Sequence, residues 1–239
     1  MNVQLFIPCF VDQLYPQTAF NMIKVLEKAG CTVTYNEEQT CCGQPAFNAG
    51  FRTHARDVCS KFIKDFSGTD YIVAPSASCV GFVRNYIPIL FEDSSVHKAV
   101  KALQARTFEF SEFLVNVLHT DNLGASLNAK ATYHDSCAGL RECRIKTEPR
   151  RLLANVKGLE LVEMNDVETC CGFGGTFAVK FEPISIGMAD QKVINASQTK
   201  AEYIISTDLS CLMHIQGYIN HKKLGMQTLH IADVLASGW

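Results

Sequence analysis

Two short stretches of the chain repeat each other: CCGQP at residues 41–45 and CCGFGG at residues 170–175. Each cysteine pair lies between two single cysteines. The single cysteine before the pair is 32 positions away in the first half and 33 in the second, and the one after it is 37 and 40 positions away. The residues before the last cysteine also repeat, as YIV at 71–73 and YII at 203–205. Agreement in register at so many positions indicates an internal duplication.

The duplication assigns four cysteines to each half. The first cysteine set is Cys9, Cys41, Cys42 and Cys79, and the second cysteine set is Cys137, Cys170, Cys171 and Cys211. A polar stretch near residues 119–130 separates the two copies. We therefore predict two tandem homologous domains, residues 1–122 and 123–239, related by pseudo-twofold symmetry.

Strand patterns alternate with helix patterns in both halves. Apolar residues recur with helical spacing over residues 19–29 and 51–66. The predicted strands are residues 5–8, 33–35, 71–74, 107–110, 132–134, 159–163, 203–206 and 228–230. Such alternation predicts an α/β fold with mostly parallel sheets. Because ligands of such sheets bind beyond the carboxyl ends of the strands, we expect each cysteine set to converge at one sheet edge.

Composition narrows the class of protein. Hydrophobic residues make up 47% and charged residues 19%, as in a folded globular chain, and the net charge of −2 lacks the basic excess of a nucleic-acid binder. No apolar run approaches the roughly 18 residues of a membrane span, and the N-terminus lacks a signal-peptide pattern. We predict a cytoplasmic protein. In that reducing compartment, eleven cysteines favour metal or redox chemistry over disulfides.

Each cysteine set suits an iron–sulfur cluster, which is usually held by four thiolates. Two adjacent cysteines reach one metal centre only through a tight turn, and Gly43 and Gly172 permit such a turn because glycine tolerates positive φ. All eight cysteines of the two sets are therefore predicted ligands. Structural zinc is the alternative, because four thiolates also make a tetrahedral zinc site. The short Cys-x-x-Cys spacing of most zinc sites is absent.

Four further residues have more than one interpretation. Cys31 and Cys59 are expected to be buried core thiols, and Cys143 is either a core thiol or a neighbour of the second site. His134 precedes Cys137 by three residues. Its ring either donates a hydrogen bond to a cluster sulfur or bonds to the backbone at a strand end.

The stretches CCGQP, CCGFGG and YHDSC at residues 133–137 together resemble the cysteine-rich CCG domain family. That domain occurs in tandem in heterodisulfide reductase and in the iron–sulfur subunits of glycolate and anaerobic glycerol-3-phosphate oxidoreductases. The resemblance covers essentially the whole chain and is to the lactate-utilisation members in particular. One departure concerns the last element, Cys-x-x-Cys in heterodisulfide reductase, whose first cysteine is here Ser76 in one half and Asp208 in the other. These two residues are either oxygen ligands or helix caps.

The resemblance implies an oxidoreductase subunit that transfers electrons during oxidation of L-lactate to pyruvate. It implies one cluster per half, expected to be of the 4Fe–4S type. It also implies two partners, a ferredoxin-type iron–sulfur protein and a third component of the complex. The alternatives are a thiol/disulfide redox subunit similar to heterodisulfide reductase and a zinc-stabilised, non-enzymatic interaction protein.

Overall fold

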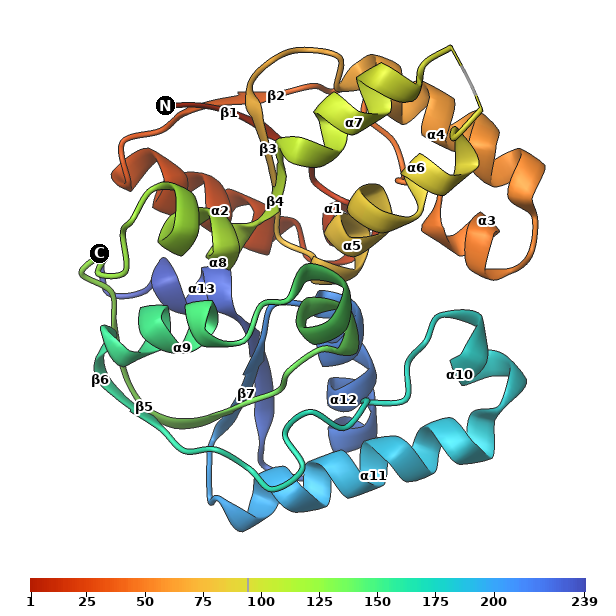
Figure 1. The fold of residues 1–239 in the computed structure, drawn as a ribbon. Helices are drawn as coiled ribbons and strands as arrows, with labels where there is room; N and C mark the ends of the chain where they lie inside the picture. The colour runs from red at the N-terminus through yellow and green to blue at the C-terminus, as the bar shows by residue number, and fades with distance from the viewer. Residues whose placement is uncertain (94) are drawn as a thin grey trace.

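The computed structural model describes residues 1–93 and 95–239 and places one four-stranded parallel sheet in each half of the chain (Figure 1). The first sheet has the order β2-β1-β3-β4 and the second the order β6-β5-β7-β8. Their strands are β1 (Asn2–Leu5), β2 (Thr32–Tyr35), β3 (Tyr71–Ala74), β4 (Thr107–Glu109), β5 (Ser126–Tyr133), β6 (Lys157–Leu161), β7 (Tyr203–Ser206) and β8 (Gln227–His230). Every neighbouring pair is parallel. The predicted α/β class is confirmed.

Helices connect the strands, as parallel neighbours require. Those of the first half are α1 (Cys9–Leu14), α2 (Pro16–Lys28), α3 (Gln44–Asn48), α4 (Arg52–Asp65), α5 (Ala77–Asn85), α6 (Ile87–Leu90), α7 (His97–Ala105), α8 (Phe110–Glu112) and the π-helical turn η1 (Phe113–Val117). Those of the second are the π-helical turn η2 (Ala138–Cys143), α9 (Thr147–Ala154), α10 (Thr176–Lys180), α11 (Glu182–Gln198), α12 (Leu209–His221) and α13 (Ile231–Leu235). Across the described ranges, none of the helices has the length and apolar character that crossing a membrane requires.

Several sequence-based boundaries need correction. The strand predicted at residues 159–163 is β6 at Lys157–Leu161, and the one predicted at 107–110 ends at Glu109 because Phe110 begins α8. The strand predicted at residues 5–8 ends at Leu5, and residues 6–8 instead lead from the sheet edge into Cys9. Their apolar character reflects burial, since Phe6 is fully buried and Ile7 nearly so. In the polar stretch 119–130, residues from Ser126 onward belong to β5 and pair with β6.

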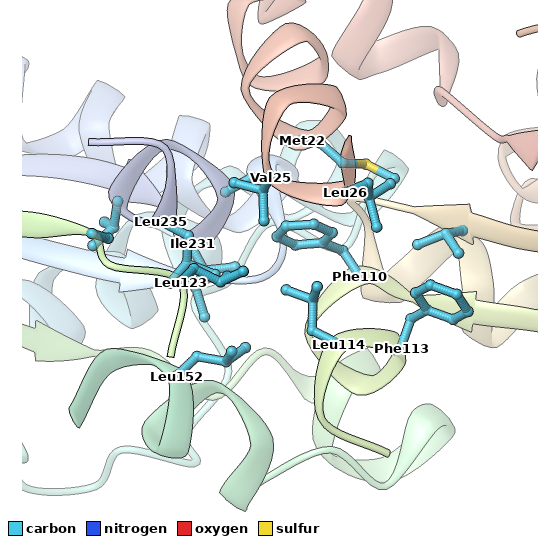
Figure 2. Close-up of a cluster of buried hydrophobic side chains, with 14 of the residues drawn as sticks. Met22, Val25, Leu26, Phe110, Phe113, Leu114, Leu123, Leu152, Ile231 and Leu235 are labelled. Carbon is cyan, nitrogen blue, oxygen red and sulfur yellow. The ribbon is translucent and has the colours of Figure 1, made fainter. Parts of the chain in front are cut away.

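Alternate residues of the strands face different cores, because successive side chains point to opposite faces of a sheet. Ile72 and Ala74 of β3 face a core formed with α4, α5 and α7, whereas Val73 faces the centre of the molecule. The central core also takes side chains from the second half (Figure 2). Its labelled members are Met22, Val25, Leu26, Phe110, Phe113, Leu114, Leu123, Leu152, Ile231 and Leu235. The two halves therefore share one continuous hydrophobic core.

The contact between the halves follows the predicted pseudo-twofold symmetry. Ser76 forms an isolated antiparallel bridge with Asp208, its counterpart in the second half. Helix α2 packs on α13, and α9 packs on α8, which is the same arrangement with the halves exchanged. Figure 1 shows these four helices between the two sheets.

Candidate metal centre between the two halves

The single cysteines of each set follow the central strands of their sheet. Cys9 begins α1 after β1, and Cys79 lies in the first turn of α5 after β3. In the second half, Cys137 follows β5, and Cys211 lies in the first turn of α12 after β7. Since β1 pairs with β3 and β5 with β7 in parallel, the two single cysteines of each half lie at the same sheet edge.

The cysteine pairs reach these edges through turns that only glycine fits well. Gly43 has φ 98° and Gly172 has φ 93°, in the left-handed region. A Cβ atom on Gly172 would lie 2.6 Å from the carbonyl oxygen of Ser185, and one on Gly43 would lie 3.0 Å from Cys59 Sγ. The Gly43 N–H donates to Cys41 Sγ at 3.5 Å, and the Gly172 N–H donates to Cys170 Sγ at 3.4 Å. Both glycines thus fix the sulfur of the first cysteine in the pair.

The thiols of each set are linked by side-chain hydrogen bonds. In the first set Cys41 contacts Cys42 and Cys9, and Cys42 also contacts Cys79. The thiols of Cys42 and Cys9 donate to Cys41, which lowers the pKa of Cys41 to about 3. The structure therefore brings together all four cysteines of the first set and favours one thiolate among them.

The second set repeats this arrangement. Hydrogen bonds from Cys137 and Cys171 lower the pKa of Cys170 to about 2. Cys171 in turn contacts Cys211. In both halves the pKa of the first cysteine of the pair is lowered chiefly by the neighbouring thiols that donate to it, and the glycine N–H adds to the effect.

All eight cysteines line one cavity of about 490 Å³ between the halves. Aromatic side chains of both halves complete part of its wall, including Phe10, Phe82 and Phe173. Arg141 and Glu142 of η2 also line it. The two cysteine sets therefore face a common space and not opposite surfaces of the molecule.

Ser76 and Asp208 cap the helices that carry the last cysteines. Ser76 Oγ accepts a hydrogen bond from the Cys79 N–H at 3.4 Å, and Asp208 Oδ1 accepts one from the Ser210 N–H at 3.2 Å. Asp208 Oδ2 also accepts one from the Ser78 N–H of the first half at 2.8 Å. The capping interpretation of these positions is confirmed.

His134 faces the second set and is fully buried. Its ring nitrogens have no hydrogen-bond partner among the described residues, so the backbone-bonded interpretation of the ring is wrong. A ring nitrogen of His134 and the sulfurs of Cys171 and Cys211 all lie within 4.8 Å of one another, close enough to hold a metal ion. Burial and the nearby Lys192 lower the pKa of His134 to about 3, so the imidazole is neutral.

The sequence pattern of the cysteine-rich domain CCG matches residues 3–84 and again residues 131–216. The chain belongs to the CCG family. Lactate utilization protein A of Geobacillus thermodenitrificans is 43% identical over 235 residues, 98% of each chain. The protein of the same name from Bacillus pumilus is 43% identical over 237 residues, 99% of this chain and 100% of that one.

Among solved structures, a hypothetical protein from Helicobacter pylori is similar, with a TM-score of 0.62 and 13% identity. The match covers 98% of this chain and 48% of that one, so this chain spans about half the length of that protein. At such low identity the likeness shows the fold alone. It agrees with the two parallel sheets described above.

Three cysteines lie outside the two cysteine sets, and all three are buried. Cys31 is part of the central core, as predicted. Cys59 donates to the carbonyl oxygen of Cys42 at 3.3 Å, and burial raises its pKa to about 12. Cys143 donates to the carbonyl oxygen of Ala77 at 3.3 Å and packs in the core of the first half. Cys143 is therefore a thiol of the contact between the halves.

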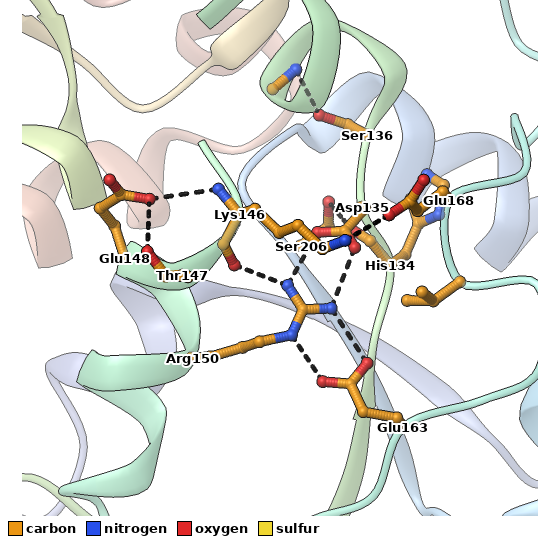
Figure 3. Close-up of polar contacts among 12 residues, drawn as sticks. His134, Asp135, Ser136, Lys146, Thr147, Glu148, Arg150, Glu163, Glu168 and Ser206 are labelled. Carbon is orange, nitrogen blue, oxygen red and sulfur yellow. Dashed lines mark hydrogen bonds and ion pairs between the residues drawn. The ribbon is translucent and has the colours of Figure 1, made fainter. Parts of the chain in front are cut away.

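Two features of this CCG protein could not be predicted from its sequence. Arg150 forms a bidentate ion pair with the buried Asp135, at 2.9 Å for both contacts, and also binds Glu163 at 2.6 and 2.9 Å (Figure 3). This network fixes the loop that leads from β5 to Cys137. The second feature is Lys192, which is buried within α11. Its only signal in the sequence is a lysine at an apolar position of the helix pattern.

Proposed function

We propose that the chain is an iron–sulfur electron-transfer subunit of an oxidoreductase that converts L-lactate to pyruvate. The observation that carries the proposal is the convergence of two sets of four thiols on one cavity. The relatives named Lactate utilization protein A supply the substrate.

The thiol groups of the two cysteine sets are suitable ligands for iron–sulfur clusters. Each half offers four soft thiol ligands, and an acidic thiol with a backbone N–H contact stands within each set. A cluster bound there would supply reversible one-electron transfer. We assign all eight cysteines as ligands, one cluster of the 4Fe–4S type to each set, and residues 1–122 and 123–239 as the two domains. We also place the chain in the cytoplasm, because eleven cysteines suited to metal or redox chemistry favour a reducing compartment.

The chain carries electrons between partners in this proposal. We name a ferredoxin-type iron–sulfur protein and a third component of the lactate-utilisation system. Purified alone, the chain is expected not to oxidise lactate. Lactate-dependent reduction should appear when the other components are added, and robust lactate oxidation by the isolated chain would contradict the assignment.

Metal content gives the direct test. Anaerobically purified protein is expected to contain iron and sulfide, and Cys42→Ser and Cys171→Ser should each remove about half of both. Cys31→Ala is the matched control, because Cys31 is also buried but lies outside the two sets. Colourless anaerobic protein with stoichiometric zinc would overturn the iron–sulfur assignment in favour of a zinc-stabilised protein. The grouping of His134 with Cys171 and Cys211 is the observation that favours zinc.

A thiol/disulfide redox subunit remains the second candidate, favoured by the single cavity that both cysteine sets line. A substrate in that cavity would contact both halves. Against it, Ser76 and Asp208 cap helices where heterodisulfide reductase has further cysteines. Electron paramagnetic resonance separates the candidates, because ordinary four-thiolate clusters and the unusual clusters of heterodisulfide reductase give different spectra.

A further inference from the structure

The two halves differ directly behind their cysteine sets. Phe6 and His134 occupy the same place, three residues before the first cysteine of each set. The backbone N–H of Phe6 donates to the Val73 carbonyl oxygen at 3.0 Å, and that of His134 donates to the Ile205 carbonyl oxygen at 2.8 Å. Both side chains are fully buried. Where the first half has a phenyl ring, the second has an imidazole.

A second pair of positions differs in the same way. A Cβ atom on the glycine of the cysteine pair would meet Ala55 in α4 of the first half and Ser185 in α11 of the second. Phe62 and Lys192 follow these contacts by seven residues, and both are buried. A buried phenylalanine of the first half is thus replaced by a buried lysine in the second.

The two replaced residues interact in each half. Phe6 and Phe62 pack edge to face with ring centroids 4.8 Å apart. Lys192 lies close enough to act electrostatically on His134; burial lowers the pKa of Lys192, and the nearby Cys171 and Cys170 act against that lowering. An aromatic contact behind the first set therefore corresponds to a polar, cation-bearing contact behind the second.

This polar contact is incomplete without a ligand. Lys192 Nζ donates to the carbonyl oxygens of Asp166 and Val167 at 2.8 and 3.1 Å, but the His134 ring has no partner in the described structure. A buried polar group left without a hydrogen bond destabilises the fold, because it has lost its hydrogen bonds to water and gained none in the protein. The ring lies within 4.8 Å of two sulfurs of the second set. A sulfur-rich group bound there would accept the missing hydrogen bond.

We propose that His134 and Lys192 raise the reduction potential of the centre held by the second cysteine set above that of the centre held by the first. The inference rests on the proposed function, since it requires a redox-active group at both sets. His134 would act on the second centre through an N–H···S hydrogen bond, and Lys192 would act through its positive charge. Phe6 and Phe62 give the first centre no such hydrogen bond and no positive charge.

The direction follows from electrostatics. Reduction adds negative charge to a cluster, and hydrogen bonds to its sulfurs and nearby positive charge stabilise that form. The effect is large here because the interior screens charge less than water. Carboxylates of the second half act in the opposite sense, and Asp166 lies near Lys192. Asp135 is neutralised by its bidentate pair with Arg150, and Asp208 spreads its charge over hydrogen bonds with Ser78 and Ser210.

A redox titration followed by electron paramagnetic resonance tests the proposal. The variants are His134→Phe, which installs the first-half residue, and Lys192→Met, which removes the charge at similar length. Each is expected to lower the ratio of reduced to oxidised second centre by about tenfold or more at fixed potential. This corresponds to a reduction potential lower by about 59 mV for a one-electron couple. The first centre should keep its potential. A Cys42→Ser background assigns the signals, because only the second set then remains complete.

The control Phe6→Leu alters the core behind the first set without a polar change and should leave the second potential unaltered. Circular dichroism of each variant confirms the fold before titration. Pulsed resonance on protein with ¹⁵N-histidine should show a nitrogen coupling that His134→Phe removes. Equal potentials in the unaltered protein, or an unchanged second potential in both variants, would overturn the inference alone. Absence of iron and sulfide in the unaltered protein would overturn the proposed function and the inference with it.

Discussion

The Asp208 side chain caps α12 and also forms part of the contact between the two halves. It accepts hydrogen bonds from Ser210 within its own half and from the Ser78 N–H across the contact. We predict that Asp208→Ala lowers the free energy of unfolding by about 2–4 kcal/mol, because a cap and a charge-assisted hydrogen bond are lost together. Ser76→Ala removes a cap and a hydroxyl contact with Ser78, both within one half, and should cost about 1 kcal/mol. Urea unfolding of both variants measures the difference, and equal losses would contradict it.

Glu109 is buried at the start of α8, and burial raises its pKa to about 8. Its Oε2 accepts hydrogen bonds from the Ser111 and Glu112 N–H groups, whereas Oε1 has no partner in the described structure. The folded protein therefore holds this proton to higher pH than the unfolded chain does. The stability that it contributes is complete below about pH 4.5, declines as pH rises, and is lost above about pH 8.

The test is Glu109→Gln, which keeps an acceptor for the capping N–H groups but cannot ionise. We expect the variant to gain stability relative to the unaltered protein as pH rises from 5 to 8.5, by more than about 1 kcal/mol. Comparing the two proteins at each pH cancels the buried histidines and the cysteines, which titrate in both. Parallel stability curves would show that Glu109 is ionised throughout.

Between elements, α5 of the first half packs closely on η2 of the second. Gly81 of α5 makes this packing possible, because a Cβ atom there would lie 2.6 Å from Glu142 Cβ. Glu142 is held in turn by Asn85 Nδ2 and the Tyr86 hydroxyl. We predict that Gly81→Ala lowers the midpoint of thermal unfolding despite the higher helix propensity of alanine, since overpacking costs about 1–3 kcal/mol.

The control is Gly217→Ala in α12, where a Cβ atom meets no other atom within 4 Å. It should stabilise the protein by about 0.5–1 kcal/mol, as expected for glycine in a helix interior. Opposite signs for the two substitutions would identify the α5–η2 contact as the cause. A gain in stability for both would contradict the close approach.

At the level of elements, strands can be predicted wherever a short β-branched run is bounded by polar residues. The predicted strands at residues 71–74 and 203–206 have the observed bounds of β3 and β7. The end of β1 differs from prediction because Phe6 and Ile7 are buried and apolar, as strand residues often are, but lie beyond the strand. The start of β5 differs because its first residues are polar, as linker residues often are. These differences depend on tertiary contacts that a local pattern does not record.

The same limit applies to the candidate centre. The duplicated spacing is enough to predict which thiols come together within each half. It cannot show that both sets face one cavity, because that depends on how the halves pack. Nor can it pair His134 with Lys192, which lie on β5's exit and on α11 and are far apart in sequence.

In the whole molecule, the cavity and the central core are both built from two halves. Helices α2 and α8 of the first half pack on α13 and α9 of the second, and Thr18 and Asn21 both donate to Asp233 across that contact. The core between the sheets is continuous through this contact. The duplication thus produced two homologous domains that fold against each other and place their cysteine sets around a common space.

Separation of the halves gives the last prediction. Expressed alone, residues 1–122 would expose Val25, Leu26 and Phe110, and residues 123–239 would expose Leu152 and Ile231, all now buried. Burying each such side chain is worth about 1.5–3 kcal/mol, and native domains are stable by only about 5–15 kcal/mol. We therefore expect neither half to show cooperative thermal unfolding alone, and each to bind a hydrophobic dye. Mixing the two should restore a cooperative transition and remove the dye signal, because the shared core then reforms. A cooperative transition of either half alone, without dye binding, would mean that each domain carries a sufficient core of its own.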